Sequence, residues 1–222
     1  MLDTAIDDAA AARRMMVDCQ IRTADVTNPD VLESMLAVPR ELFVPPQRAG
    51  QAYSDYAITL GEGRALLTPM VLAKLIQSAL VGSTDHVLDV GCGTGYAAAV
   101  LARIAGSVVA LEENSSLARD AQAALAKAGA ANVTVVTGPL ASGWAASAPY
   151  DVILLDGATE IVPEALGAQL KPGGRLTCVF GGGPTGKAMI YRLIEGRLVG
   201  RQVFDAAAPV LPGYVAPKTF VF

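Results

Sequence analysis

Histidine is almost absent from this chain: His86 is the only one among 222 residues. A Ser-His-Asp triad, a Cys-His pair and a His-ligated zinc site each need an imidazole beside the reacting group. His86 just precedes an apolar stretch, far in sequence from any activated serine or cysteine, and is better explained as a surface residue where a strand starts. The sequence therefore argues against all three kinds of site.

Cysteine is scarce as well. Cys19, Cys92 and Cys178 are too widely separated for a metal-binding motif or a disulfide framework. The first eight residues are acidic where a secretory signal would be basic. Arg103 interrupts the longest apolar run before it reaches membrane-spanning length. We therefore expect a cytoplasmic protein without a membrane partner or a metal.

A surplus of positive charge is also missing. The chain has 17 Lys and Arg residues against 21 Asp and Glu residues, for a net charge of −4. The adjacent Arg13 and Arg14 are only a pair on an expected helix. A nucleic-acid partner is therefore not expected, because such proteins carry a basic patch. Hydrophobic residues make up 52% of the chain, which is enough for a full core.

The most informative stretch is residues 87–96, Val-Leu-Asp-Val-Gly-Cys-Gly-Thr-Gly-Tyr. An apolar strand runs into a turn with glycines at 91, 93 and 95, and a helical pattern follows. Gly91, Gly93 and Gly95 allow the backbone to approach a ligand closely, and a helix N-terminus favours negative charge. Tyr96 stands where the dinucleotide fingerprint needs its third glycine, and no Walker lysine follows. A nucleotide-type site of another kind is indicated.

Two acids identify the expected ligand as S-adenosyl-L-methionine, with S-adenosyl-L-homocysteine as product. Asp89 would repel a pyrophosphate but suits an ammonium group. Glu112 ends the next apolar strand, where its two oxygens can accept from both ribose hydroxyls. Cys92, inside the turn, is expected to be a small filler. The alternative is a structural turn with an incidental surface acid.

The rest of the pattern predicts an α/β fold: a doubly wound, mostly parallel Rossmann-like sheet with helices on both faces, an antiparallel edge hairpin and an N-terminal helical extension. We expect the extension and a substrate-side loop over residues 1–68 and the cofactor-binding domain over 69–222, packed as one unit. Strands are expected at 87–90, 107–111, 132–136, 150–156, 175–180, 188–194 and 198–204. Helices are expected at 7–22, from Pro29, from Pro69, at 95–104, at 115–128 and from Pro163, with a turn at 171–174.

Several blocks resemble the protein-L-isoaspartate O-methyltransferase family. They are Val-Leu-Glu-Ser-Met from Val31, Val-Pro-Arg-Glu-Leu-Phe-Val-Pro from Val38, Ala-Tyr-Ser-Asp from Ala52, and Gly-Glu-Gly at 61–63. The glycine turn, Gly-Trp at 143–144, Ala-Pro-Tyr-Asp at 148–151 and Lys-Pro-Gly-Gly-Arg-Leu at 171–176 continue in the same order. The likeness runs from about position 13 to the end. The block from Val38 is more specific than the glycine turn, which class I methyltransferases share.

The resemblance implies methyl transfer from S-adenosylmethionine to the α-carboxyl of an isoaspartyl residue in damaged protein. The ester then closes to a succinimide, which reopens partly to normal aspartate. This chemistry suits a site without histidine. A carboxylate with a pKa of roughly 4 is already a nucleophile at neutral pH and needs no general base. The implied partner is a damaged protein or peptide.

The acceptor loop departs from the family pattern. The resemblance implies Gln-Thr-Ile-Ser-Gln-Pro after the Gly-x-Gly, with the serine placing the substrate carboxylate. Here residues 64–69 read Arg-Ala-Leu-Leu-Thr-Pro, so Leu67 holds the serine position and cannot donate a hydrogen bond. Thr68 and Arg64 are the nearby candidates for the acceptor. Arg64 is either a ligand for a substrate anion or a surface residue.

Two further departures follow later strands. The family's Gly-Asp-Gly, whose aspartate reaches the adenine, is Gly-Pro-Leu here, so adenine binding would rest on the backbone at Pro139 and Leu140. Glu113 is a further candidate cofactor residue beside Glu112. Asp156 stands where the family has small uncharged residues. It either binds a cationic substrate or acts as a base, or it caps the strand end or the following turn.

Four hypotheses compete. The first is an active isoaspartyl methyltransferase. The second keeps the fold and cofactor but uses another acceptor, such as a small metabolite. The third is a catalytically silent module that binds the cofactor and acts through a partner. A nicotinamide dehydrogenase comes last, because Tyr96 and Asp89 disfavour it.

Overall fold

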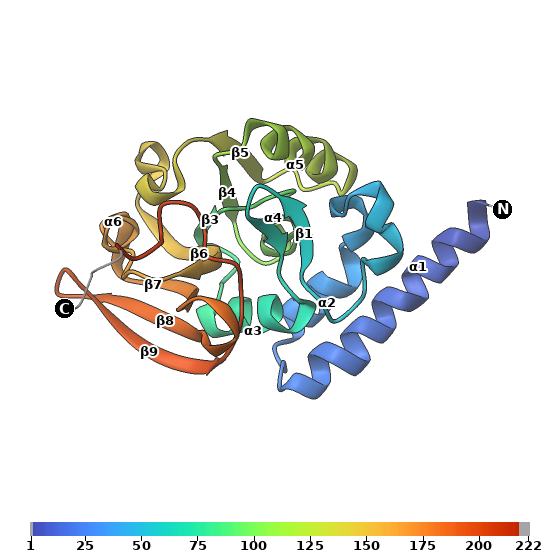
Figure 1. Ribbon diagram of the computed structural model, residues 1–222, viewed down its shortest axis with the longest axis horizontal. Helices are drawn as coiled ribbons and strands as arrows, with labels where there is room; N and C mark the ends of the chain where they lie inside the picture. The colour runs from blue at the N-terminus through green and yellow to red at the C-terminus, as the bar shows by residue number, and fades with distance from the viewer. Residues whose placement is uncertain (1, 218–222) are drawn as a thin grey trace.

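A seven-stranded sheet forms the centre of the computed structural model, which describes residues 2–217 (Figure 1). The strand order is β5-β4-β3-β6-β7-β8-β9, and the first five strands are parallel. β8 pairs antiparallel with both β7 and β9. The predicted α/β class, the mostly parallel sheet and the antiparallel edge hairpin are confirmed.

The strands lie close to their predicted positions. β7 differs, because it begins at Leu170 and takes in residues 171–174, where the sequence predicted a turn. The register against β6 shifts there, so the Gly-Gly pair forms an irregularity within the strand. The bounds are β3 His86–Val90, β4 Ser107–Glu112, β5 Val133–Thr137, β6 Tyr150–Thr159, β7 Leu170–Phe180, β8 Lys187–Ile194 and β9 Arg197–Asp205.

The helices begin at the capping residues that the sequence provides. Asn28 accepts from two backbone N–H groups at the start of α2, with Pro29 at the first helical position. Thr68 caps α3 and Asn114 caps α5 in the same way. The predicted first helix is divided: α1 ends at Met16, and a π-turn and a 3₁₀-turn follow. The bounds are α1 Leu2–Met16, α2 Pro29–Ala37, α3 Pro69–Ala79, α4 Tyr96–Ala102, α5 Ser115–Lys127 and α6 Glu164–Gly167.

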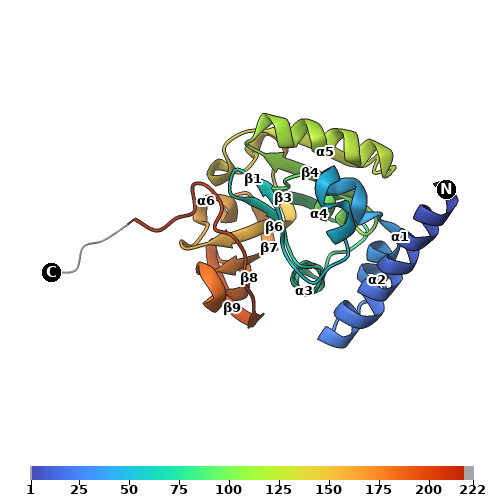
Figure 2. The ribbon, with the colours of Figure 1, turned by 45° about the vertical axis from the view of Figure 1, so that its right-hand side comes forward.

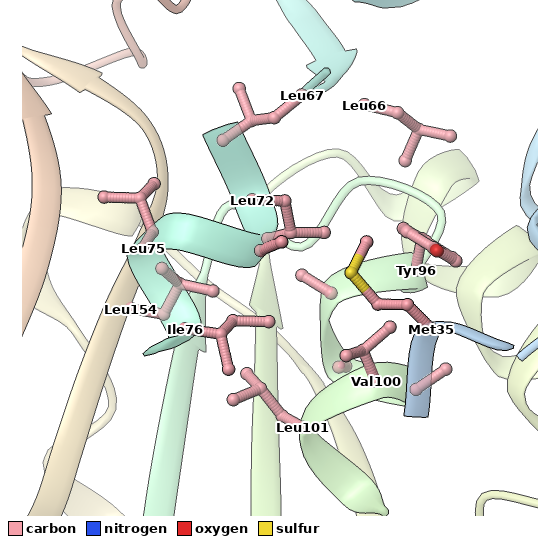
Figure 3. Close-up of a cluster of buried hydrophobic side chains, with 14 of the residues drawn as sticks. Met35, Leu66, Leu67, Leu72, Leu75, Ile76, Tyr96, Val100, Leu101 and Leu154 are labelled. Carbon is pink, nitrogen blue, oxygen red and sulfur yellow. The ribbon is translucent and has the colours of Figure 1, made fainter. Parts of the chain in front are cut away.

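The two faces of the sheet are covered differently. On one face, α3, α4 and α5 pack over Val87, Val108 and Leu154, and this core extends to α2 (Figure 3). The other face carries Leu88, Leu111 and neighbouring strand residues under the short α6 and irregular segments. Helices therefore lie on both faces, as predicted, although irregular chain replaces much of the helical cover on the second face.

Three segments outside the sheet matter for the site. The N-terminal helices α1 and α2 lie at the opposite end of the molecule from β8 and β9 (Figure 2). A separate two-stranded hairpin is formed by β1 (Ile58–Gly61) and β2 (Arg64–Leu66). The segment after β9 returns across β6 (Figure 1), where Val210 forms a parallel bridge with Ala158.

One buried cluster contains residues from both sides of position 68, including Met35 and Val100. The division of the chain at 68/69 therefore stays a prediction, whereas close packing of the two parts is observed. Within residues 2–217, no helix has the length and apolar character needed to cross a membrane.

Candidate functional site

Three carboxyl groups meet at the carboxyl ends of adjacent parallel strands. Side chains along a strand alternate between faces. Asp89 continues the row of Val87, and Glu112 continues the row of Val108 and Ala110. Asp156 continues the row of Val152 and Leu154 on β6. All three belong to the α3–α4 face, beside the position where the strand order reverses. Ligands of doubly wound sheets bind at such a switch point.

The glycine turn connects β3 to α4. Gly91, Gly93 and Gly95 have φ values of 81°, 55° and 91°, and residues with a Cβ rarely adopt such values. The amide of Gly91 donates to the Leu111 carbonyl over 2.8 Å, so the turn is fastened to the end of β4. The Thr94 hydroxyl donates to the Phe43 carbonyl over 2.6 Å and joins the turn to the N-terminal extension.

Glu112 and Arg64 form a buried ion pair. Their exposed fractions are 0% and 2%. Arg64 Nε lies 3.0 Å from Oε2, and Arg64 Nη2 lies 3.1 Å from Oε1. The backbone amides of Gly93, Glu113 and Asn114 also donate to the same carboxylate. The residue predicted to hold the ribose thus has its acceptor positions filled by protein donors.

Asp89 and Asp156 are in the opposite situation. Both Asp89 oxygens and Oδ1 of Asp156 lie buried without a hydrogen-bond partner within normal geometry among the described residues, although the Ala98 backbone lies close enough to Asp89 to lower its pKa slightly. Burial, and then repulsion by Asp156 and Glu112, raises the pKa of Asp89 well above its usual range. Burial also raises the pKa of Asp156 to about 7, against the opposing effect of Arg40. Two buried carboxyl groups are therefore left to face a group of positive charge or a hydrogen-bond donor.

The space beside the turn is filled by leucines from the hairpin and the C-terminal segment. A methyl group added at Gly91 would lie 2.9 Å from Leu211 Cδ1, and one added at Gly93 would lie 2.7 Å from Leu60 Cδ1. The carboxyl groups of Asp89 and Asp156 suit S-adenosylmethionine, because buried carboxyl groups without a partner among the described residues match its sulfonium and ammonium charges. Leu60 and Leu211 occupy the space beside the turn, and Arg64 occupies the Glu112 carboxylate.

The acceptor-loop residues predicted from the sequence are buried or used in capping. Leu67 is 2% exposed and lies at the top of the buried cluster, above Leu72 of α3 (Figure 3). Thr68 accepts from the amide of Val71 at the start of α3. Arg64 points inward to Glu112, so its role as a substrate-anion ligand stays a prediction that requires this ion pair to open.

The remaining predicted cofactor residues surround the turn. Cys92 is fully buried, and burial raises the pKa of its thiol well above the usual range, which fits a filler better than a nucleophile. Tyr96, the first residue of α4, is buried against the N-terminal extension, and the centre of its ring lies 5.6 Å from that of Phe43. Leu140, which follows Pro139, donates its amide to the exposed Glu113 at 3.4 Å. Their roles in cofactor binding stay predictions.

Sequence reasoning missed Leu60, Leu211 and Arg40 as neighbours of the site. Arg40 is fully buried, donates to the carbonyls of Ala52 and Leu67, and lies 4.5 Å from the centre of the Tyr96 ring. The Val-Pro-Arg block was a signal for Arg40. Nothing local in the sequence distinguishes Leu60 or Leu211 from other apolar residues.

Comparison with known proteins agrees with this geometry. The family model described as Protein-L-isoaspartate(D-aspartate) O-methyltransferase (PCMT) matches residues 11–201. A protein-L-isoaspartate O-methyltransferase of Methylorubrum extorquens is 43% identical over 90% of this chain and 86% of its own length. Another, from Pelotomaculum thermopropionicum, is 41% identical over 79% of this chain and 76% of its own length.

Solved structures show the same fold. One named protein-L-isoaspartate O-methyltransferase superposes with a TM-score of 0.78 at 24% identity, over 91% of this chain and 66% of that longer chain. A putative Plasmodium falciparum relative, solved with S-adenosyl-L-homocysteine, gives a TM-score of 0.77 at 17% identity, over 90% and 97% of the two chains. The chain belongs to the protein-L-isoaspartate O-methyltransferase family, whose members are S-adenosylmethionine-dependent methyltransferases.

Proposed function

We propose that this chain transfers a methyl group from S-adenosylmethionine to the α-carboxylate of isoaspartyl residues in damaged protein. The observation that carries the proposal is the group of buried carboxyl side chains at the end of β3, β4 and β6, in a chain that belongs to the family. The bound cofactor supplies a methyl group activated by its sulfonium. The protein supplies position, because the attacking carboxylate is ionised at neutral pH and needs no base.

Each residue has a proposed part in that positioning. Glu112 accepts from the ribose hydroxyls once Arg64 has left it. Asp89, whose oxygens are buried without a partner in the part of the chain that the structure describes, balances the positive charge of the cofactor. The backbone at Leu140 contacts the adenine. Arg64 and Thr68 hold the acceptor carboxylate in line with the methyl group, an alignment that contributes at most about 7–11 kcal/mol to lowering the barrier.

The decisive experiment is transfer of a labelled methyl group to a pair of synthetic peptides. One contains an isoaspartyl residue and the other the ordinary aspartyl residue in the same sequence. We expect label in the isoaspartyl peptide alone. Transfer to neither peptide, while calorimetry detects S-adenosylhomocysteine binding, would contradict the proposal and support a silent cofactor-binding module.

A second acceptor class is favoured by one observation. Asp156 is buried, its Oδ1 has no hydrogen-bond partner within residues 2–217, and burial raises its pKa to about 7. A base with a pKa near neutrality can remove a proton from an amine or hydroxyl acceptor as the methyl is transferred. For this alternative, we expect release of S-adenosylhomocysteine with amine or hydroxyl compounds and its loss in Asp156→Asn. If Asp156→Asn still releases S-adenosylhomocysteine with these amine or hydroxyl compounds at the wild-type rate, Asp156 is not their base.

A further inference from the structure

The Arg64–Glu112 contact uses up the carboxylate that a ribose needs. A carboxylate has two oxygens with about four lone-pair positions. The guanidinium supplies contacts of 3.0, 3.1 and 3.2 Å, and three backbone amides donate to the same two oxygens. Ribose hydroxyls therefore cannot reach Glu112 while Arg64 remains. The backbone donors belong to the glycine turn (Gly93) and to the connection between β4 and α5 (Glu113 and Asn114), so Arg64 is the only side-chain donor to this carboxylate among the described residues and is the partner that can leave.

Arg64 belongs to a hairpin that is not hydrogen-bonded into the main sheet. The β1–β2 hairpin is a separate two-stranded sheet with a bulge beside Gly61. Its connecting residues, Gly61, Glu62 and Gly63, all have positive φ and are exposed. Ile58 and Leu66 anchor the base of the hairpin in the buried core, whereas residues 61–63 at its tip are exposed. An opening that reverses the contact of Leu60 and Arg64 with the turn is therefore confined to the tip and to these two side chains.

A released Arg64 needs another anion. Its side chain is 2% exposed, and its Nη1 lies buried without a partner among the described residues. A buried guanidinium that loses its carboxylate is costly unless a second carboxylate replaces the first. The α-carboxylate of an isoaspartyl acceptor offers the same two-oxygen geometry, to which the planar guanidinium is suited.

Within residues 64–69, Arg64 is the only residue with a charged side chain. Leu67, at the family's serine position, directs its side chain into the core, and its carbonyl accepts from Arg40 over 2.7 Å. The hydroxyl of Thr68 accepts from the amide of Val71. Arg64 lies three residues before Leu67 on the same hairpin strand and turn, which places its charge beside this loop.

We propose that Arg64 exchanges one carboxylate for another: it closes the site on Glu112 when the cofactor is absent, and it binds the acceptor carboxylate once ribose has taken Glu112. The cofactor must then bind before the acceptor. This inference rests on the proposed function, because the second carboxylate is that of the acceptor. Arg64 is thus both a specificity-determining residue and the element that sets the order of binding.

The first measurement uses the wild-type protein. A fluorescent isoaspartyl peptide is titrated with protein, with and without saturating S-adenosylhomocysteine, and the aspartyl peptide of the same sequence is the control. We expect the isoaspartyl peptide to bind at least tenfold more tightly when S-adenosylhomocysteine is present. Equal affinity in the two states, together with normal methylation, would overturn the exchange while leaving the proposed function intact. An isoaspartyl peptide that neither binds nor is methylated would overturn both.

The second measurement uses Arg64→Gln and Arg64→Lys, with Arg48→Gln as a matched control. Arg48 is an exposed arginine of the same extension, so its replacement removes one charge outside the site. By calorimetry, Arg64→Gln should bind S-adenosylhomocysteine at least tenfold more tightly than wild type and the peptide at least tenfold more weakly. Arg64→Lys keeps the positive charge but lacks the planar guanidinium that contacts both carboxylate oxygens. Its affinities for S-adenosylhomocysteine and for the peptide should therefore fall between those of wild type and Arg64→Gln. Weaker S-adenosylhomocysteine binding in both variants, with folding verified by thermal unfolding, would show that Arg64 positions Glu112 and would overturn the exchange.

Discussion

Breaking the Arg64–Glu112 ion pair should destabilise the cofactor-free protein strongly. Both side chains are almost completely buried, and they share three contacts between 3.0 and 3.2 Å. Removing one partner of such a pair leaves an uncompensated buried charge and costs about 3–5 kcal/mol. We expect Arg64→Gln and Glu112→Gln each to show a loss of this size in the free energy of unfolding.

The double variant Arg64→Gln/Glu112→Gln distinguishes a true pair from two separate residues. It contains two neutral amides and no buried charge, so it should be more stable than either single variant. The single losses should therefore not add, and the coupling energy should reach about 2–3 kcal/mol. Two independent sites would instead give additive losses within about 0.5 kcal/mol.

The assay is urea unfolding at neutral pH without cofactor, with linear extrapolation to water. For a chain of this size, each kcal/mol corresponds to about 2–4 °C in the midpoint of thermal unfolding, so the single variants should unfold roughly 6–20 °C lower. Arg48→Gln, an exposed control, should stay within about 0.5 kcal/mol of wild type. Losses below about 1 kcal/mol in the single variants would refute the reasoning, because the ion pair would then not hold the site closed in the cofactor-free protein.

Three further predictions concern the surroundings of the site. Leu67→Ser should lower the free energy of unfolding by about 2–5 kcal/mol, because Leu67 is a buried core residue, and should not raise isoaspartyl methylation; a gain in methylation at unchanged stability would show that the position faces the acceptor. Because its pKa is raised to about 7, the neutral Asp156 carboxyl contributes stability that is fully present below about pH 4 and is lost as the pH rises through about 7. Asp156→Asn should therefore show a smaller fall in unfolding temperature between pH 5 and 8 than wild type; an identical fall would argue against a buried neutral carboxyl. Leu211→Ala should cost about 2–5 kcal/mol in urea unfolding yet bind S-adenosylhomocysteine more tightly by calorimetry, since no side chain has to leave Gly91; weaker binding would mean that Leu211 contacts the ligand.

Features that depend on local sequence were predictable. The run from β3 through the glycine turn into α4 follows from an apolar stretch and glycines that tolerate positive φ. Asn28, Thr68 and Asn114 cap the helices that follow them because their side chains satisfy free backbone amides. The position of Glu112 at a strand end was likewise predictable.

Features that depend on distant contacts were not. Arg64 was expected to meet a substrate anion or solvent, but it crosses to a carboxylate 48 positions away. Hydrophobicity alone does not say which apolar side chain enters the space beside Gly91, so Leu211 and Leu60 could not be predicted there. The strand start at Leu170 was also missed, because the Gly-Gly pair that signals a turn is accommodated as an irregularity in a strand held by both neighbours.

The bridge between Val210 and Ala158, which seats Leu211 beside the glycine turn, has a consequence for biosynthesis. The parallel strands leave the ribosome before the segment that carries Leu211, because that segment follows β9 in the chain. A nascent chain that has reached only Asp205 would therefore expose the end of β6 and the glycine turn that Leu211 otherwise covers. Such a chain, stalled or truncated there, should be digested by protease at β6 far faster than the full-length protein.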